Sequence, residues 1–132
     1  MSEAEASHRP APGEWNAKET LAHLIAGERE THVWIADLIN CDERWSDNFE
    51  NPTNVPARIG ATTAVFSTVS ALLDELKRNE SETAAMLDAL PPEFVARKGS
   101  YWRLGHNLLQ APEHAATHRN QIRTAIEAAR RQ

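Results

Sequence analysis

Apolar residues recur at steps of three and four along the chain, and this repeat is the feature that most restricts its fold. Such steps place successive side chains on one face of an α-helix. The clearest example spans residues 62–90, where a polar residue fills one gap. Its positions are Val65, Val69, Leu72, Leu76, Asn79, Thr83, Met86 and Leu90. Because no segment shows the alternation of a β-strand, we expect an all-α protein built as a bundle of long helices.

Capping and helix-breaking residues mark the ends of the predicted helices. Asn16, followed three residues later by Glu19, is the signature of a capping box, so a helix should run over residues 17–40. Pro91 and its neighbouring proline end the helix predicted over residues 62–90, since proline cannot continue the hydrogen-bond ladder. The last helix is predicted over residues 104–130. We expect a kink or a restart at Pro112, because proline inside a helix costs about 3 kcal/mol.

Two segments lack the helical repeat. Residues 1–14 contain two prolines and a glycine without apolar periodicity, so we expect an extended lead-in with at most one short turn. Residues 41–61 are rich in Asp, Asn, Pro and Gly and carry two isolated aromatics, Trp45 and Phe49, which predicts a long loop. The length of 132 residues is that of a single domain with a substantial core, spanning residues 1–132.

Composition narrows the range of partners. The chain has 14 basic and 19 acidic residues and a formal net charge of -5, which argues against binding to nucleic acid or to an anionic membrane surface. Small molecules or proteins are the expected partners. A single cysteine cannot form an internal disulfide, and no leader-like segment opens the chain, so we expect a cytoplasmic protein. No apolar run approaches the ~20 residues of a membrane span.

Two histidines of the last predicted helix indicate a metal site. His114 and His118 lie four residues apart in the segment PEHAATHRNQI, residues 112–122. At that spacing their Cβ atoms lie roughly 5–6 Å apart, so both imidazoles can reach one ion. Two ligands are too few, and His23, on the interior stripe of the first long helix, is the candidate for the third. Three neutral imidazoles suit zinc, nickel, cobalt or ferrous iron.

Two polar residues near these histidines are candidates for supporting roles. Gln121 lies one turn beyond His118 on the same face, where it could orient a ligand or satisfy a buried backbone group. Glu19 lies one turn before His23 and is interpreted first as a capping residue and second as an acceptor for the His23 ring. Ala115 occupies the position of the catalytic glutamate in zinc proteases of the HExxH type, which disfavours a protease mechanism.

Other reactive side chains are interpreted as structural. His106 should fall out of register with the histidine pair, because Pro112 interrupts the helix between them. His32 follows Glu28 by one turn and should form a buried or interfacial ion pair with it. Cys41 lies at a predicted helix C-terminus, where the helix dipole opposes formation of a thiolate nucleophile.

Two segments taken together resemble the DinB-like superfamily of metal-dependent enzymes. These are GEWNAKETLAHL, residues 13–24, and HAATHRNQI, residues 114–122. The shared pattern is a tryptophan, an acidic residue and a histidine early in one helix, then two histidines four apart and a glutamine in the final helix. In this sequence it comprises Trp15, Glu19, His23, His114, His118 and Gln121. The resemblance implies a four-helix bundle that holds a divalent metal, often nickel or zinc, on the three histidines. It also implies thiol chemistry, since characterised relatives include thiol-dependent S-transferases and a thiol-dependent isomerase.

The chain departs from this family at its start. Family members have a full first helix before the tryptophan, and here 14 residues precede Trp15. One apolar stripe of the first long helix would then lack a cover within the chain. It consists of Leu21, Ile25, Ile35 and Ile39. At about 25 cal/mol per Å² of apolar surface, leaving it in water would forgo several kcal/mol. We therefore expect an antiparallel bundle of three long helices, completed by a homodimer through this stripe.

The predicted function is that of a metal-dependent enzyme. An open coordination position would let the metal activate a water or a low-molecular-weight thiol, which fits a thiol S-transferase or a hydrolase. The alternative is a non-catalytic protein that binds metal or a small ligand in a dimeric bundle, because no convincing general base is apparent. Glu19 and Glu30 flank His23 near the solvent edge of its stripe. A DNA-binding role conflicts with the acidic balance of the chain.

Overall fold

The structure is a computed structural model that describes residues 1–40 and 54–131. The described residues form six helices and no strand, which confirms the all-α prediction. In chain order the helices are α1 (Glu3–Ser7), α2 (Ala17–Ile39), α3 (Asn54–Val65), α4 (Val69–Asp88), α5 (Pro92–Ala96) and α6 (Lys98–Arg130). Cys41, Trp45 and Phe49, on which parts of the sequence analysis bear, lie outside the described residues. No described helix combines the length and the apolarity that a membrane span requires.

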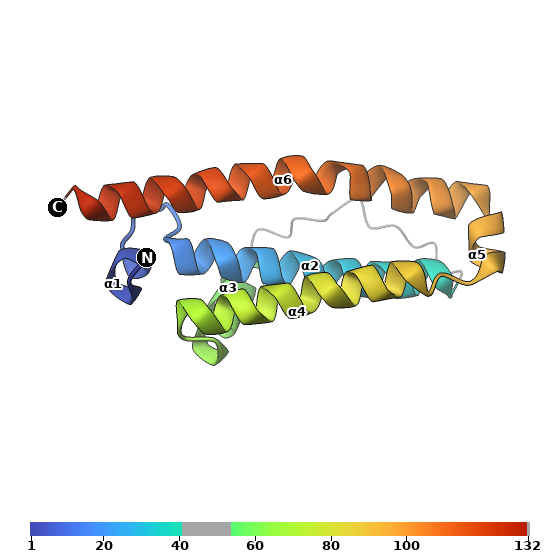
Figure 1. The fold of residues 1–132 in the computed structure, drawn as a ribbon, viewed down its shortest axis with the longest axis horizontal. Helices are drawn as coiled ribbons and strands as arrows, with labels where there is room; N and C mark the ends of the chain where they lie inside the picture. The colour runs from blue at the N-terminus through green and yellow to red at the C-terminus, as the bar shows by residue number, and fades with distance from the viewer. Residues whose placement is uncertain (41–53, 132) are drawn as a thin grey trace.

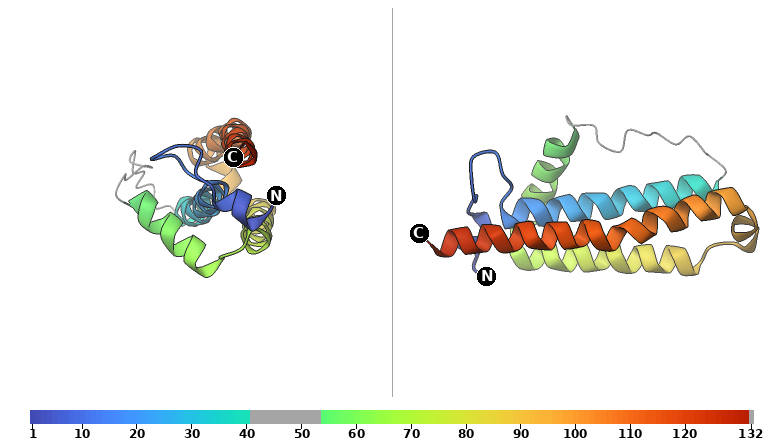
Figure 2. Two further views of the ribbon diagram at one scale, coloured as in Figure 1. Left: turned by 90° about the vertical axis from the view of Figure 1, so that its left-hand side faces the viewer. Right: turned by 90° about the horizontal axis from the view of Figure 1, so that it is seen from above.

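Three long helices run the length of the molecule, with α2 between the other two (Figure 1). α2 and α4 run in the same direction, and α6 runs back antiparallel to both. α3 stands across the long helices instead of along them (Figure 2). α2 contacts α4, α3, α6 and α1, so it is the helix on which the others assemble.

The start of α2 follows its predicted capping box. The Asn16 side chain accepts a hydrogen bond from the Glu19 amide at 2.9 Å, and the Glu19 carboxylate accepts one from the Asn16 amide at 2.9 Å. Two of the backbone donors that a helix N-terminus leaves unpaired are satisfied in this way. The first residue of α2 and its phase are therefore fixed by a local signal, which determines the direction of His23.

The prolines among the first 14 residues had led us to expect an extended segment, but part of this segment is helical. Ser2 and Glu5 form a second capping box, with the Ser2 hydroxyl accepting from the Glu5 amide at 3.2 Å, and this starts α1. Glu5 also pairs with Arg130 of α6 at 2.7 Å. Glu3 accepts from the Val69 amide at 2.8 Å, at the first residue of α4. The short helix thereby joins the ends of two long helices.

The predicted helix over residues 62–90 is wrong in its first part. α3 begins at Asn54, inside the segment expected to be a loop, and ends at Val65. A separate helix, α4, begins at Val69, because the Thr68 hydroxyl accepts from the Ala71 amide at 3.1 Å and caps it. The apolar repeat continues across this break, which is why periodicity alone did not reveal it.

The last helix also differs from its prediction. α6 begins at Lys98, six residues earlier than expected, and passes through Pro112 without a restart. Its axis bends within its orange part (Figure 2). Leu104 on one side of the proline and His118 on the other are both buried against the rest of the protein. Packing on both sides therefore holds the helix together across the proline.

The stripe that was expected to be covered by a second subunit is covered within the chain. Leu21 is 4% exposed, and Ile25 and Ile35 are fully buried. Leu21 and Ile25 belong to one apolar cluster with Ile59 of α3, while Ile35 belongs to another with Phe94 of α5. Ile39 packs against the second cluster. The premise that this stripe lacks a cover within the chain is therefore wrong, because α3 and α5 supply the cover that the sequence analysis did not foresee. The homodimer itself stays a prediction.

The polar gap in the apolar repeat of α4 is part of a buried network between α2 and α4. Glu75 is 6% exposed and Asn79 is 4% exposed. The Glu75 carboxylate accepts from Asn79 Nδ2 at 2.8 Å and from Arg29 of α2 at 2.9 Å. Burial alone would raise the pKa of Glu75, but the hydrogen bonds from Asn79 and Arg29 and the charge of Arg78 lower it below 4.5.

His32 joins the same interface, though not with the predicted partner. Its Nε2 atom lies 2.8 Å from the Thr83 hydroxyl and 3.1 Å from the Asn79 carbonyl oxygen. Glu28 accepts a hydrogen bond from Thr83 at 2.6 Å. The carboxylate within 4.0 Å of His32 is that of Glu82 on α4. The expected pair of His32 with Glu28 is therefore replaced by contacts of both residues with α4.

Replacing Glu75 with alanine tests the contribution of this network. We expect Glu75→Ala to lower the free energy of unfolding by about 1–3 kcal/mol at neutral pH, because the Asn79 amide and Arg29 lose a buried acceptor. The folded pKa of Glu75 is depressed, so its contribution is present above pH 4.5 and is lost as the pH falls below that value. Urea denaturation from pH 7 to pH 3 measures both effects.

The matched control for this substitution is Glu80→Ala on the same helix, whose side chain is exposed. It should change the free energy of unfolding by no more than about 0.5 kcal/mol. An equal loss in the two variants, or a loss in Glu75→Ala that persists unchanged at pH 3, would contradict the role assigned to the network.

Candidate metal centre

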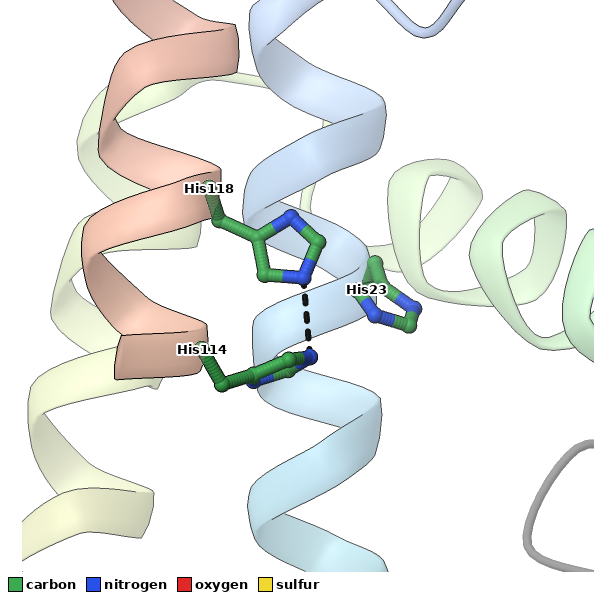
Figure 3. Close-up of side chains that lie close together, drawn as sticks. All are labelled: His23, His114 and His118. Atoms are coloured by element: carbon green, nitrogen blue, oxygen red, sulfur yellow. Dashed lines mark hydrogen bonds between the residues drawn. The ribbon is translucent and has the colours of Figure 1, made fainter. Parts of the chain in front are cut away.

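The structure brings together the three histidines that the sequence singles out. His23 comes from α2, and His114 and His118 come from α6, which runs antiparallel beside it (Figure 3). One nitrogen of each ring lies within 4.8 Å of the others. The Nε2 atoms of His114 and His118 are 2.9 Å apart, and the ring centroids of His23 and His118 are 4.7 Å apart. Among the described residues, no other group of three His, Cys, Asp or Glu side chains converges in this way.

The three rings differ in exposure. His118 is 6% exposed, His23 is half-buried and His114 is exposed. His118 is thus enclosed between α6 and α2, while the cluster opens to solvent on the side of His114. Such an arrangement combines a fixed inner ring with an accessible outer one.

Gln121 sets the orientation of the buried ring. Its Oε1 atom accepts a hydrogen bond from Nδ1 of His118 at 2.6 Å. A proton held on Nδ1 makes Nε2 of His118 an acceptor, and it accepts a hydrogen bond from Nε2 of His114 at 2.9 Å (Figure 3). The sequence left two roles open for Gln121, to orient a ligand or to satisfy a buried backbone group. The contact with His118 supports the first role, with the histidine as the group that is oriented.

Glu19 does not take the second role considered for it. Its carboxylate caps α2 through the Asn16 amide at 2.9 Å and pairs with Arg9. The neighbour of the His23 ring is Trp15 instead, with ring centroids 4.8 Å apart. The capping geometry turns Glu19 back toward the helix start, away from the next turn, and Trp15 fills the space beside the imidazole.

The charge environment keeps His23 neutral. Burial lowers the pKa of its imidazole first, and electrostatic interactions with His118, His114 and Arg58 lower it further, to about 4. Arg58 lies on α3, where it donates to the Ala26 carbonyl oxygen at 2.6 Å and pairs with Glu30. The sequence analysis missed Arg58 because it lies in a segment expected to be a loop, where no helical register could be assigned.

A pocket of about 610 Å³ adjoins the histidine cluster. Two of its lining residues also contact the histidines, since Trp15 packs on His23 and Gln121 holds His118. The full lining consists of Pro10, Gly13, Glu14, Trp15, Thr117, Asn120, Gln121 and Thr124. Its lining is mostly apolar with a few hydroxyl and amide groups, a composition typical of small-molecule sites.

His106 lies outside the cluster, as the sequence analysis predicted. Its ring stacks on Trp102 with centroids 5.3 Å apart and lies 3.2 Å from the Gln110 amide nitrogen. The reason differs from the predicted one, because α6 is continuous between His106 and His114. His106 is exposed on α6 two turns before His114, away from His23.

The fold and the site define a class of all-α proteins in which two antiparallel helices hold three histidines beside a tryptophan. Within that class, the protein-family model described as the DinB superfamily matches residues 1–122, and the chain belongs to this superfamily. No curated protein and no solved structure matches the chain. The match covers all three histidines and Gln121, so the resemblance inferred from the two short segments is confirmed for the family.

The neutral state of His23 can be tested directly in the metal-free protein. We expect its imidazole to remain neutral on acidification until about pH 4, and to titrate near its ordinary value of 6.5 once urea unfolds the chain. NMR of ring-labelled histidines, assigned with His23→Gln, measures both midpoints. His23 of the unfolded chain binds a proton at a higher pH than His23 of the folded protein. The free energy of unfolding of the metal-free protein should therefore fall as the pH falls from 6.5 toward 4. A folded midpoint near 6.5 would refute the described environment.

Proposed function

We propose that this protein is a metal-dependent enzyme that holds a divalent ion on His23, His114 and His118. The observation that carries the proposal is the approach of three ring nitrogens to within 4.8 Å of one another. In a tetrahedral site with zinc–nitrogen bonds of about 2.1 Å, the ligand nitrogens lie about 3.4 Å apart, so the two less buried rings would have to rotate toward the His118 ring to share one ion. Membership of the DinB superfamily supports the same reading.

The donor set fits a divalent metal chemically. His23 is neutral because its pKa is lowered to about 4, so protons do not compete for its nitrogen near pH 7. Nδ1 of His118 donates a hydrogen bond to Oε1 of Gln121, with 2.6 Å between the two atoms, and this directs the Nε2 lone pair inward. Three imidazoles suit zinc or nickel, and also cobalt or ferrous iron.

Thiol transfer is the reaction that these residues support best. When bound with an open coordination position, a divalent metal lowers the pKa of a thiol or a water and so supplies a nucleophile near neutral pH. A thiol, with an ordinary pKa of about 8.5, requires far less help than water at about 15.7. Trp15 covers one side of His23 and excludes water there, while the pocket beside Gln121, whose lining is mostly apolar, offers a few hydroxyl and amide groups to a low-molecular-weight thiol or its acceptor. A hydrolase is the second enzymatic possibility.

One observation favours a non-catalytic alternative. The two carboxylates that flank His23 along α2 are both engaged, Glu19 with Arg9 and Glu30 with Arg58. Neither is placed as a general base, which a hydrolase needs more than a thiol transferase does. A protein that binds metal or a small ligand without turnover is therefore the competing hypothesis.

Metal content of the purified untagged protein tests the site. We expect about one divalent ion per chain for the wild type and a large loss in His114→Ala, since the ring removed supplies one of three ligands. His114 is exposed, so its truncation should leave the fold intact. His106→Ala, which removes an exposed histidine from the same helix, is the matched control and should retain the metal. Substoichiometric metal that is the same in all three proteins would refute the site.

A thiol-transfer screen tests the reaction. The metal-loaded protein is incubated with several low-molecular-weight thiols and electrophiles, and products are identified by mass spectrometry. We expect turnover that disappears after chelation and in His114→Ala, and that falls about 10–100-fold in Gln121→Ala because the His118 ring loses its orienting partner. Stoichiometric metal binding without turnover of any pair would favour the non-catalytic hypothesis.

A further inference from the structure

Arg58 of α3 lies over the face of α2 that carries His23. Its guanidinium donates to the Ala26 carbonyl oxygen at 2.6 Å and pairs with Glu30. Ala26 and Glu30 follow His23 by three and seven residues, which is about one and two helical turns, so all three share a face. Figure 3 shows α6 with its two histidines on one side of His23 and α3 on the other. The cation therefore approaches the cluster from the side that α6 leaves open.

The ion pair is oriented with its cation inward. The Arg58 side chain is 25% exposed, while that of Glu30 is 42% exposed. The carboxylate is thus better solvated and more strongly screened, and the field of the guanidinium persists toward the histidines. The two described contacts use two of the five N–H donors of a guanidinium.

We propose that Arg58 makes this centre selective for an anionic ligand, so that the thiol or acceptor it binds carries a carboxylate close to the group that reaches the metal. The inference rests on the proposed function, because it assumes that the three histidines hold a metal. Three neutral imidazoles leave the charge of a divalent ion uncompensated, and Arg58 adds to that positive charge. A guanidinium also matches the geometry of a carboxylate, which it binds through paired N–H groups.

A purely structural role for Arg58 is the competing explanation. The contacts with Ala26 and Glu30 join α3 to α2, and loss of this clamp would lower stability without any effect on ligand choice. The two roles differ in one measurable quantity, the preference of the centre among ligands of different charge. A clamp does not change that preference, whereas a charge beside the site does.

The experiment compares three small thiols of similar size on the cobalt-loaded protein. Mercaptoacetate is anionic, 2-mercaptoethanol is neutral and 2-mercaptoethylamine is cationic, and each is titrated while the thiolate-to-cobalt absorption is followed. The quantity of interest is the affinity ratio of the anionic to the cationic thiol. Intrinsic differences between the thiols cancel when this ratio is compared between wild type and variants.

We expect Arg58→Gln to lower this ratio about fivefold to tenfold, the effect of one partly screened charge. Arg58→Lys keeps the charge and should retain most of the preference. Glu30→Gln removes the partner carboxylate and should raise the ratio. Arg103→Gln, which removes an exposed arginine from the first turns of α6, controls for net charge and should leave the ratio unchanged.

The possible results separate the two hypotheses. A protein that binds no cobalt, or that gives no thiolate absorption with any thiol, overturns the proposed function and the inference with it. Normal cobalt and thiol binding with the same ratio in wild type, Arg58→Gln and Glu30→Gln overturns the inference alone. If Arg58→Gln does not fold, Arg58→Lys and Glu30→Gln still decide the matter, because the first keeps the cation and the second leaves it unpaired.

Discussion

The packing of α6 against α2 is the contact on which the rest of the structure depends. It is made at two apolar positions along the helices. Ile122 packs against the cluster that contains Leu21 and Ile25, and Leu104 belongs to the cluster of Ile35 and Leu38. His114 and His118 lie between these positions on α6, and His23 lies beside the first of them on α2. Apolar burial at both positions therefore fixes the distance and rotation of the two helices, and the histidines meet as a consequence.

The molecule contains two polar regions between helices, and they differ in how they are satisfied. Between α2 and α4, a buried carboxylate is matched by Asn79 and Arg29, so the charge and the hydrogen bonds are balanced within the chain. Between α2 and α6, three nitrogen bases face one another and an arginine lies nearby, and burial together with these neighbours lowers the pKa of His23. The first region has the hydrogen-bonded buried polar groups that a stable interface requires. In the second region the lowered pKa of His23 leaves its lone pair available to a ligand that accepts it.

Local signals in the sequence predicted much of the fold and most of the site. The capping box at Asn16 fixed the start and rotation of α2. The spacing of His114 and His118 is helical as predicted, because α6 is continuous past Pro112. What escaped prediction depends on contacts between distant segments. Ile59 and Phe94 cover the stripe on α2, and no sequence pattern around either residue indicates which surface it packs against. The Ser2–Glu5 capping box is an exception, because this signal was present and was outweighed by the prolines that follow it.

The element that sequence analysis mistook for a loop connects stability with chemistry. Ile59 is 5% exposed and belongs to the same cluster as Leu21 and Ile25, so it fixes the position and rotation of α3 on α2. Arg58 is its immediate neighbour, and successive residues of a helix point about 100° apart. With Ile59 directed into the core, Arg58 is carried to the edge of the same interface, where Ala26 and Glu30 of α2 receive it. The apolar contact that replaces the expected subunit interface therefore also sets the charge beside His23. If Arg58 selects the ligand as we propose, ligand preference can change through α3 while the three histidines on α2 and α6 stay as they are.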